Sequence, residues 1–320
     1  MDVETMLDAE IAAALAELPI GQLDFGTWTV DTVPSLREAM SGMPAPPEPP
    51  PSIERYDVVV PDPDGKWDPT VRVYRPRGAS GPLPCLVWIH GGGYMFGSAL
   101  QDDPRLSRWA EEAPCVVVSV EYRLAPEHPY PAPLDDCYVS LRWVHEHAAE
   151  LGVDPARIAI GGASAGGGLA AGLGLLARDR AEVPLIFQLL IYPMIDDRNV
   201  SRSSQIVKAP IWSRQANLLG WHAYLGHEPG QDDEPIYAVP ARADDLSGLP
   251  STWIGVGSLD VFRDEDIHYA LGLLGAGIAT ELHVYPGAPH GFESIVPTAA
   301  IAIQCGRDID TALYRALRTR

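Results

Sequence analysis

Residues 157–168 read RIAIGGASAGGG, and this stretch decides the fold. Ile158 to Ile160 form an apolar run long enough for a buried strand, and the small residues after the glycines favour a helix. A serine between two glycines at this junction, Gly162-Ala-Ser164-Ala-Gly166, is typical of a tight strand–turn–helix elbow. Glycine has no Cβ, so strand and helix can approach closely on both sides of the serine. We therefore predict that Ser164 projects from the start of a helix as a nucleophile.

Strand-like and helical segments alternate along most of the chain. Helical patterns cover residues 2–18, Pro133–Leu151, Ser164–Arg180 and Glu265–Leu274, and a further helix follows Pro297. The eight strand-like runs are Tyr56–Val60, Val71–Arg75, Cys85–Ile89, Cys115–Val120, Arg157–Ile160, Leu185–Tyr192, Thr252–Val256 and Glu281–Tyr285. Continuously apolar strands joined by helices indicate a mostly parallel sheet buried on both faces. The sequence thus predicts an α/β fold, with an eight-stranded, mostly parallel sheet flanked by helices and carrying a helical cap.

Two segments interrupt this alternation and set the domain boundaries. Residues 43–51 are dense in proline, which neither a helix nor a central strand tolerates. Residues 195–250 lack a clear strand, and a structureless loop of that length is improbable, so a helical insertion is expected. We predict an N-terminal cap segment over residues 1–50 and a cap insertion over 195–250. The catalytic domain then comprises residues 51–194 and 251–320.

Composition excludes several classes of function. The formal net charge of −20 disfavours nucleic acids and anionic membrane surfaces, both of which require clustered Lys and Arg. No apolar run approaches the ~18 residues of a membrane span, and the acidic N-terminus lacks a signal-peptide pattern, so a cytoplasmic location is expected. The four cysteines have neither metal nor redox spacing and are expected to be buried free thiols. We expect no metal and no cofactor.

Four candidate catalytic groups follow the ends of predicted strands. Ser164 follows the fifth run, Asp260 the seventh and His290 the eighth, while Gly91–Gly93 follow the third. Ligands in open α/β sheets bind at the carboxyl ends of the strands, so these groups should meet there. The order serine, acid, histidine is that of a hydrolase triad on such a sheet. His290 would activate Ser164 as a general base, and Asp260 would orient the imidazole.

A tetrahedral intermediate at Ser164 also needs donors for its oxyanion. The backbone N–H groups of Gly92, Gly93 and Ala165 are the candidates, each typically contributing ~3 kcal/mol in the transition state. His290 is the one histidine of nine that occupies a glycine-flanked loop just past a strand end. For the acid, Asp196 or Asp197 after the sixth run is the alternative to Asp260.

Residues 264–266, Asp-Glu-Asp, instead resemble the first turn of a helix, where carboxylates complement the dipole. They are therefore not expected to supply the acid of the triad.

The chain resembles the bacterial esterases of the hormone-sensitive-lipase-like branch of the α/β-hydrolases. The resemblance is carried by HGGGY at residues 90–94, EYRLAPEHP at 121–129, GASAGG at 162–167, GSLD at 257–260 and PGAPHGF at 286–292. It implies a serine-dependent, metal-free hydrolase of short-to-medium acyl esters that works through a covalent acyl-enzyme. It also implies that the N-terminal segment and the 195–250 insertion form the cap. Relatives often use the late strands and C-terminal helix as a dimer face, so a homodimer is possible.

The sequence departs from that family at one position of the elbow. The residue before the nucleophile is commonly aspartate in the family and is Ala163 here, which removes a carboxylate next to the serine. Substrate contacts are expected from Tyr94, Ile211 and Trp212. Arg123 is expected to pair with Asp135 or Asp136, which would brace the loop beneath the site.

Two other functions are compatible with the same motifs. An amide or peptide hydrolase would use the same triad and differ in protonating an amine leaving group. A non-catalytic small-molecule-binding homologue, like the plant gibberellin receptors that resemble this family, would lack the histidine that is present as His290. A lipase gated by an oil–water interface is disfavoured because residues 195–250 contain no strongly apolar stretch.

Overall fold

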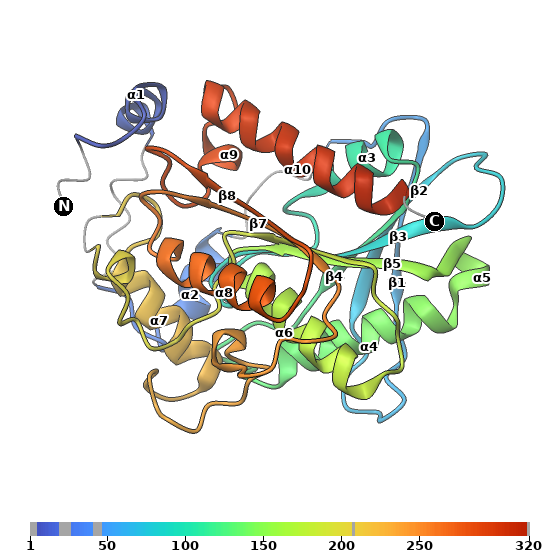
Figure 1. The fold of residues 1–320 in the computed structure, drawn as a ribbon. Helices are drawn as coiled ribbons and strands as arrows, with labels where there is room; N and C mark the ends of the chain where they lie inside the picture. Colours follow the sequence, from blue (N-terminus) through green and yellow to red (C-terminus); the bar gives the residue numbers. More distant parts are fainter. Residues whose placement is uncertain (1–4, 19–26, 41–46, 207–208, 319–320) are drawn as a thin grey trace.

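An eight-stranded sheet runs through the centre of the molecule in the computed structural model, which describes residues 5–18, 27–40, 47–206 and 209–318 (Figure 1). The strands are β1 Ile53–Val59, β2 Thr70–Pro76, β3 Leu83–Ile89, β4 Val116–Glu121, β5 Val153–Ala163, β6 Phe187–Ile191, β7 Ser251–Gly257 and β8 Thr280–Tyr285. Their order is β1-β2-β4-β3-β5-β6-β7-β8. Only the pairings of β2 with β1 and with β4 are antiparallel. The predicted fold class is therefore confirmed.

Apolar side chains on both faces of the sheet form two cores. In β3, Leu86 and Trp88 point to one face while Val87 and Ile89 point to the other, as the two-residue period of a strand requires. Helices α3 Asp103–Glu112 and α10 Ala300–Arg318 cover the first face. Helices α4 Ala132–Glu146, α6 Ala165–Arg180 and α8 Arg263–Gly275 cover the second, as Figure 1 shows.

Several short helices complete the fold. They are α1 Ala9–Glu17, α2 Val33–Met40, α5 Ala148–Leu151, α7 Arg214–Leu225, α9 Phe292–Ile295 and the 3-10 turns η3 Ser203–Gln205 and η4 Pro240–Arg242. Residues 195–250 contain α7, η3 and η4, and α7 is the one α-helix among the described residues of this segment. The sequence pattern placed the first helix over 2–18, and residues 1–4 lie outside the described chain, as do 43–46 of the proline-dense connector.

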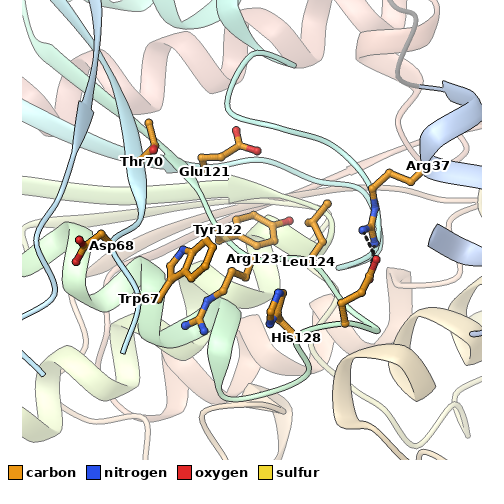
Figure 2. A pocket seen from close by; sticks show the side chains of 10 residues that line it. Arg37, Trp67, Asp68, Thr70, Glu121, Tyr122, Arg123, Leu124 and His128 are labelled. Atoms are coloured by element: carbon orange, nitrogen blue, oxygen red, sulfur yellow. Dashed lines mark hydrogen bonds and ion pairs between the residues drawn. The ribbon is translucent and has the colours of Figure 1, made fainter. Parts of the chain in front are cut away.

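The N-terminal segment contacts the body of the molecule through Arg37 of α2. Its guanidinium donates to the carbonyl oxygens of Met95 at 2.9 Å and Ala125 at 2.7 Å. It also forms an ion pair with Glu127 at 2.9 Å, drawn as a dashed line in Figure 2. These bonds connect α2 to the loop after β3 and to the 122–131 loop, on the rim of a cavity of about 340 Å³.

Arg123, on the floor of the same cavity, braces the 122–131 loop against α4 (Figure 2). Its guanidinium makes an ion pair at 2.6 Å with Asp136, whose other oxygen accepts the Arg123 backbone N–H. The guanidinium also lies over the ring of Trp67, 5.4 Å from its centroid. The expected pairing is therefore confirmed, with Asp136 rather than Asp135 as the partner, and the bracing role of the pair stays a prediction.

All four cysteines are buried free thiols, as expected. Cys85 lies in β3, and Cys115 directly precedes β4. Cys137 lies in α4 and Cys305 in α10. In the part of the chain that the structure describes, no helix is both long and apolar enough to cross a membrane.

Replacing Arg123 with alanine should lower the free energy of unfolding by about 3 kcal/mol, because it strands the buried carboxylate of Asp136 without its counter-charge. Chemical denaturation and the melting temperature measure this loss. The control is Arg142→Ala, which removes an exposed ion pair with Glu146 of the same helix and should cost less than about 1 kcal/mol. Equal effects of the two substitutions would contradict the brace.

Candidate active site

Ser164 lies at the sharp junction between β5 and α6, with φ of 58° and ψ of −122°. A Cβ on Gly162 would lie 2.2 Å from the carbonyl oxygen of Gly166, and a Cβ on Gly166 would lie 2.1 Å from that of Ile89. A side chain on Gly162 would therefore push α6 away from β5, and one on Gly166 would push α6 away from β3. The elbow predicted from the sequence is present, and it exposes the Ser164 hydroxyl at the start of α6.

His290 and Asp260 form a hydrogen-bonded chain with Ser164. Nε2 of His290 lies 2.9 Å from Ser164 Oγ, and Nδ1 lies 2.7 Å from Oδ2 of Asp260. Asp260 is fully buried, and its second oxygen accepts the backbone N–H of Phe262 at 3.0 Å. A proton on Nδ1, donated to the carboxylate, leaves the Nε2 lone pair directed at the serine hydroxyl. The structure thus brings together the three residues that the sequence nominated.

Aromatic side chains hold the imidazole of His290 in place. Tyr192 and Phe262 pack edge-on to the ring, with centroids at 4.6 Å and 5.1 Å, and Trp212 lies at 6.3 Å. His290 is only 7% exposed, as is Ser164. A ring enclosed in this way keeps its orientation and has limited contact with water, which strengthens the electrostatic interactions of the site.

The glycine loop after β3 lies against the elbow and presents free donors. A Cβ on Gly91 would lie 2.9 Å from the carbonyl oxygen of Ala163. Gly92 and Gly93 have φ of 124° and 60°, and within the described ranges neither N–H is hydrogen-bonded to a backbone acceptor. Ala165 is the first residue of α6, where N–H groups have no partner inside the helix. These are the three N–H groups expected to bind an oxyanion.

His90 supports this loop from below. Its Nδ1 lies 2.8 Å from the carbonyl oxygen of Gly91, and its ring stacks on Tyr122 at 4.2 Å. The Tyr122 hydroxyl donates to the carbonyl oxygen of His90 at 3.0 Å. Burial lowers the pKa of His90 below its ordinary value, which favours the neutral imidazole.

A pocket of about 230 Å³ opens above Ser164. Ile211 and Trp212 of the insertion line it as predicted, together with Ala163 and Tyr192. Tyr94 does not line it, which corrects the expectation that Tyr94 contacts substrate. At φ of 64° the backbone turns this side chain into the core, where the ring stacks on Tyr224 at 3.9 Å and the hydroxyl donates to Met194.

The alternative acids lie elsewhere. Asp196 forms an ion pair with Arg198 at 2.8 Å, and Asp197 forms one with Arg242 at 2.7 Å. Neither is hydrogen-bonded to His290, whose Nδ1 and Nε2 contact Asp260 and Ser164.

Glu265 and Asp266 do belong to the first turn of α8, as the pattern indicated, yet both are buried. Burial raises the pKa of each carboxyl well above its ordinary value.

Among the described residues, no group of three or more His, Cys, Asp or Glu side chains is arranged to hold a metal ion. The hydrogen-bonded chain from Ser164 to Asp260 supplies a nucleophile, a base and an orienting carboxylate from protein groups alone.

Comparison with known proteins places this site in a family. A family profile described as the alpha/beta hydrolase fold matches residues 86–294, which include every residue of the hydrogen-bonded chain and the glycine loop. The chain belongs to the α/β-hydrolases. The resemblance to their hormone-sensitive-lipase-like branch is confirmed.

The relatives of this hydrolase include several esterases. Carboxylesterase NlhH of Mycobacterium tuberculosis is 44% identical over 265 residues, which cover 79% of this chain and 80% of that protein. Esterase LipI of the same organism is 34% identical, with 86% and 87% covered. Among solved structures, a bacterial heroin esterase superposes with a TM-score of 0.88 at 43% identity, over 98% of this chain and 99% of the other.

Sequence reasoning missed several residues of the hydrolase pocket. Gln101, Asp102, Ser294 and Ile295 also line it, although none belongs to a recognisable motif. Asp102 precedes a helix and a proline, which is the pattern of an ordinary N-cap. Tyr192 had a usable signal, because it ends the sixth predicted strand at the edge where the catalytic groups meet.

Replacing Asp260 with asparagine should lower kcat roughly 10³–10⁴-fold, because an amide in place of the carboxylate stabilises the wrong imidazole tautomer. Asp196→Asn serves as the control, since Asp196 pairs with Arg198 outside the site, and it should keep turnover within about twofold. Steady-state kinetics on an aryl acetate measures both. Retained turnover in Asp260→Asn together with lost turnover in Asp196→Asn would make Asp196 the acid.

Proposed function

We propose that this hydrolase is a serine carboxylesterase that cleaves esters of short to medium acyl chains, with Ser164, His290 and Asp260 as its catalytic triad. One observation carries the assignment of roles. Ser164 Oγ, His290 Nε2 and Nδ1, and Asp260 Oδ2 form one continuous hydrogen-bonded chain with contacts of 2.9 Å and 2.7 Å. Such a chain moves a proton away from the serine as it attacks.

The chain is an ester hydrolase by its family and by its relatives. Proteins named carboxylesterase, esterase and carboxylic ester hydrolase align with 75–86% of it at 34–44% identity. Solved structures of esterases cover 98–99% of it with TM-scores of 0.85–0.88.

The first half of the reaction acylates the enzyme. Ser164 Oγ attacks the ester carbonyl carbon while its proton passes to Nε2 of His290, and Asp260 stabilises the resulting imidazolium. The carbonyl oxygen, now negative, accepts N–H groups of Gly92, Gly93 and Ala165. The intermediate then collapses: the C–O bond to the alcohol breaks, and His290 gives its proton to the departing alkoxide.

Water completes the cycle by the same route. His290 removes a proton from a water molecule, which attacks the acyl-serine carbonyl, and the acid departs as Ser164 recovers its proton. The pocket of about 230 Å³, bounded by Ile211 and Trp212, has room for a short acyl chain and supports the proposed size range.

We also propose a division of the chain into a catalytic domain and a cap. Residues 51–194 and 251–320 form the catalytic domain, and residues 1–50 with 195–250 form a cap over the carboxyl ends of the strands. Ile211 and Trp212 in the pocket, and Arg37 bound to the loop after β3, support that division.

We place the enzyme in the cytoplasm, where its four free thiols would stay reduced.

A homodimer through β8 is part of this proposal. β8 is an edge strand, and large apolar side chains are exposed on it and beside it: Val284 on β8, Leu271 and Leu274 on α8, and Ile303 on α10. An exposed apolar edge pairs readily with a second copy of itself. We expect light scattering coupled to size exclusion to give twice the chain mass, and a monomer mass would contradict the dimer.

An acyl-length series of aryl esters tests the function. Turnover should be highest for short and medium chains, should fall for long ones, and should be reduced at least about 10³-fold in Ser164→Ala. Matched anilides should react far more slowly than the esters. Esterase turnover that survives in Ser164→Ala would remove the serine from the mechanism, and anilides cleaved faster than esters would make the protein an amidase.

A further inference from the structure

The pocket wall carries a carboxylate that the triad does not use. Asp102 lines the pocket, and its Oδ2 accepts the indole N–H of Trp88 at 2.8 Å. It occupies the N-cap of α3, where an aspartate side chain normally accepts a backbone N–H, yet it makes no capping hydrogen bond. Over the described parts of the chain, no donor is bonded to Oδ1 and no cation pairs with Asp102. Helix capping therefore does not account for this side chain.

The guanidinium of Arg105 favours the charged form of Asp102, but its hydrogen bonds go to another acid. Nη2 of Arg105 donates to Glu293 and to the hydroxyl of Ser294, each at 3.0 Å. The Tyr192 hydroxyl donates to the same Glu293 at 2.8 Å. One guanidinium therefore faces two carboxylates, Asp102 and Glu293, and it cannot balance the charges of both.

Asp102 and His290 line the same pocket, so the part of the substrate near Asp102 depends on which side of the scissile bond His290 serves. His290 returns its proton to the leaving alcohol, so the alcohol lies on the His290 side of the scissile bond. The chain that follows His290 lines the pocket through Ser294, and Arg105 connects Ser294 to the helix that begins at Asp102. This connection favours the alcohol side of the pocket for Asp102 and Ser294.

We propose that Asp102 binds an ammonium group on the alcohol portion of the substrate, so that esters of amino alcohols are preferred over neutral esters of the same shape. This inference rests on the proposed function, since it requires ester cleavage at Ser164. An ammonium N–H donated to Oδ1 would complete the hydrogen bonding of a carboxylate already held by Trp88. Such charge-assisted bonds are about twice as strong as neutral ones.

Two isosteric acetates test the preference. Dimethylaminoethyl acetate carries a protonated nitrogen where isopentyl acetate carries a C–H group. The measured quantity is the ratio of kcat/KM for the amine ester to that for the neutral ester. In Asp102→Asn, which keeps the shape of the side chain and removes its charge, this ratio should fall about tenfold. Glu150→Gln makes the same charge change on an exposed helix far from the pocket and should leave the ratio unchanged.

The pH dependence of that ratio in the wild-type enzyme is a second readout. Burial raises the pKa of Asp102 above its ordinary value, with a further contribution from the Glu293 carboxylate and against the opposing effects of Arg105 and Trp88. Lowering the pH protonates the carboxyl and removes its charge, so the ratio should fall on acidification, beginning at a higher pH than for an exposed aspartate. A pH effect on the triad itself cancels in the ratio, because both esters are cleaved by the same triad. The ratio should be flat in Asp102→Asn.

The possible outcomes are distinguishable. A ratio that Asp102→Asn leaves unchanged, or a wild-type ratio that does not vary with pH, overturns the proposal, and the second readout holds even if the variant fails to fold. Methyl dimethylglycinate and methyl isovalerate place the same pair of groups on the acyl side, and a discrimination confined to that pair would also overturn it. If the wild-type enzyme does not hydrolyse isopentyl acetate faster than Ser164→Ala does, the proposed function itself is refuted.

Discussion

The close approach of β5 to α6 is the constraint on which the rest of this structure depends. It is possible because Gly162 has no Cβ to meet the carbonyl group of Gly166, and because Ser164 between them adopts a positive φ. Gly166 also contacts the carbonyl oxygens of Ile89 and His90, so the same helix start touches the strand that carries the glycine loop. The nucleophile and the oxyanion donors are therefore positioned by one packing contact.

The parallel sheet extends this positioning to the other catalytic groups. β3, β5, β6, β7 and β8 are consecutive neighbours, so their carboxyl ends form one edge, and the loops after four of them hold the glycine loop, Ser164, Asp260 and His290. Residues more than a hundred positions apart in the chain meet there without any need for flexible linkers. Rigid strands determine where each loop begins, and the loops supply the chemistry.

Much of this arrangement could be predicted from the sequence because it follows from periodicity and chain order. Buried parallel strands produce continuous apolar runs, and the groups that follow those runs must share an edge. What could not be predicted depends on the direction of single side chains. Tyr94 follows the glycines directly, but its positive φ turns it into the core.

Asp102 looks like an N-cap in the sequence, and only three-dimensional packing shows that its side chain faces the pocket instead. The burial of Glu265 and Asp266 likewise depends on how α8 docks against the sheet, because residues in the first turn of a helix are equally compatible with solvent. In both cases the local pattern matches the start of a helix, and the tertiary contact decides what the side chain does.

The four thiols give this enzyme an internal reporter of its own integrity. Each is at most 1% exposed, and burial raises the pKa of each, so the reactive thiolate is absent while the sheet and its helices stay packed. Alkylating reagents can therefore modify cysteine only in molecules that have opened. The rate of alkylation measures how often the native structure opens, in the same sample whose serine chemistry is being followed.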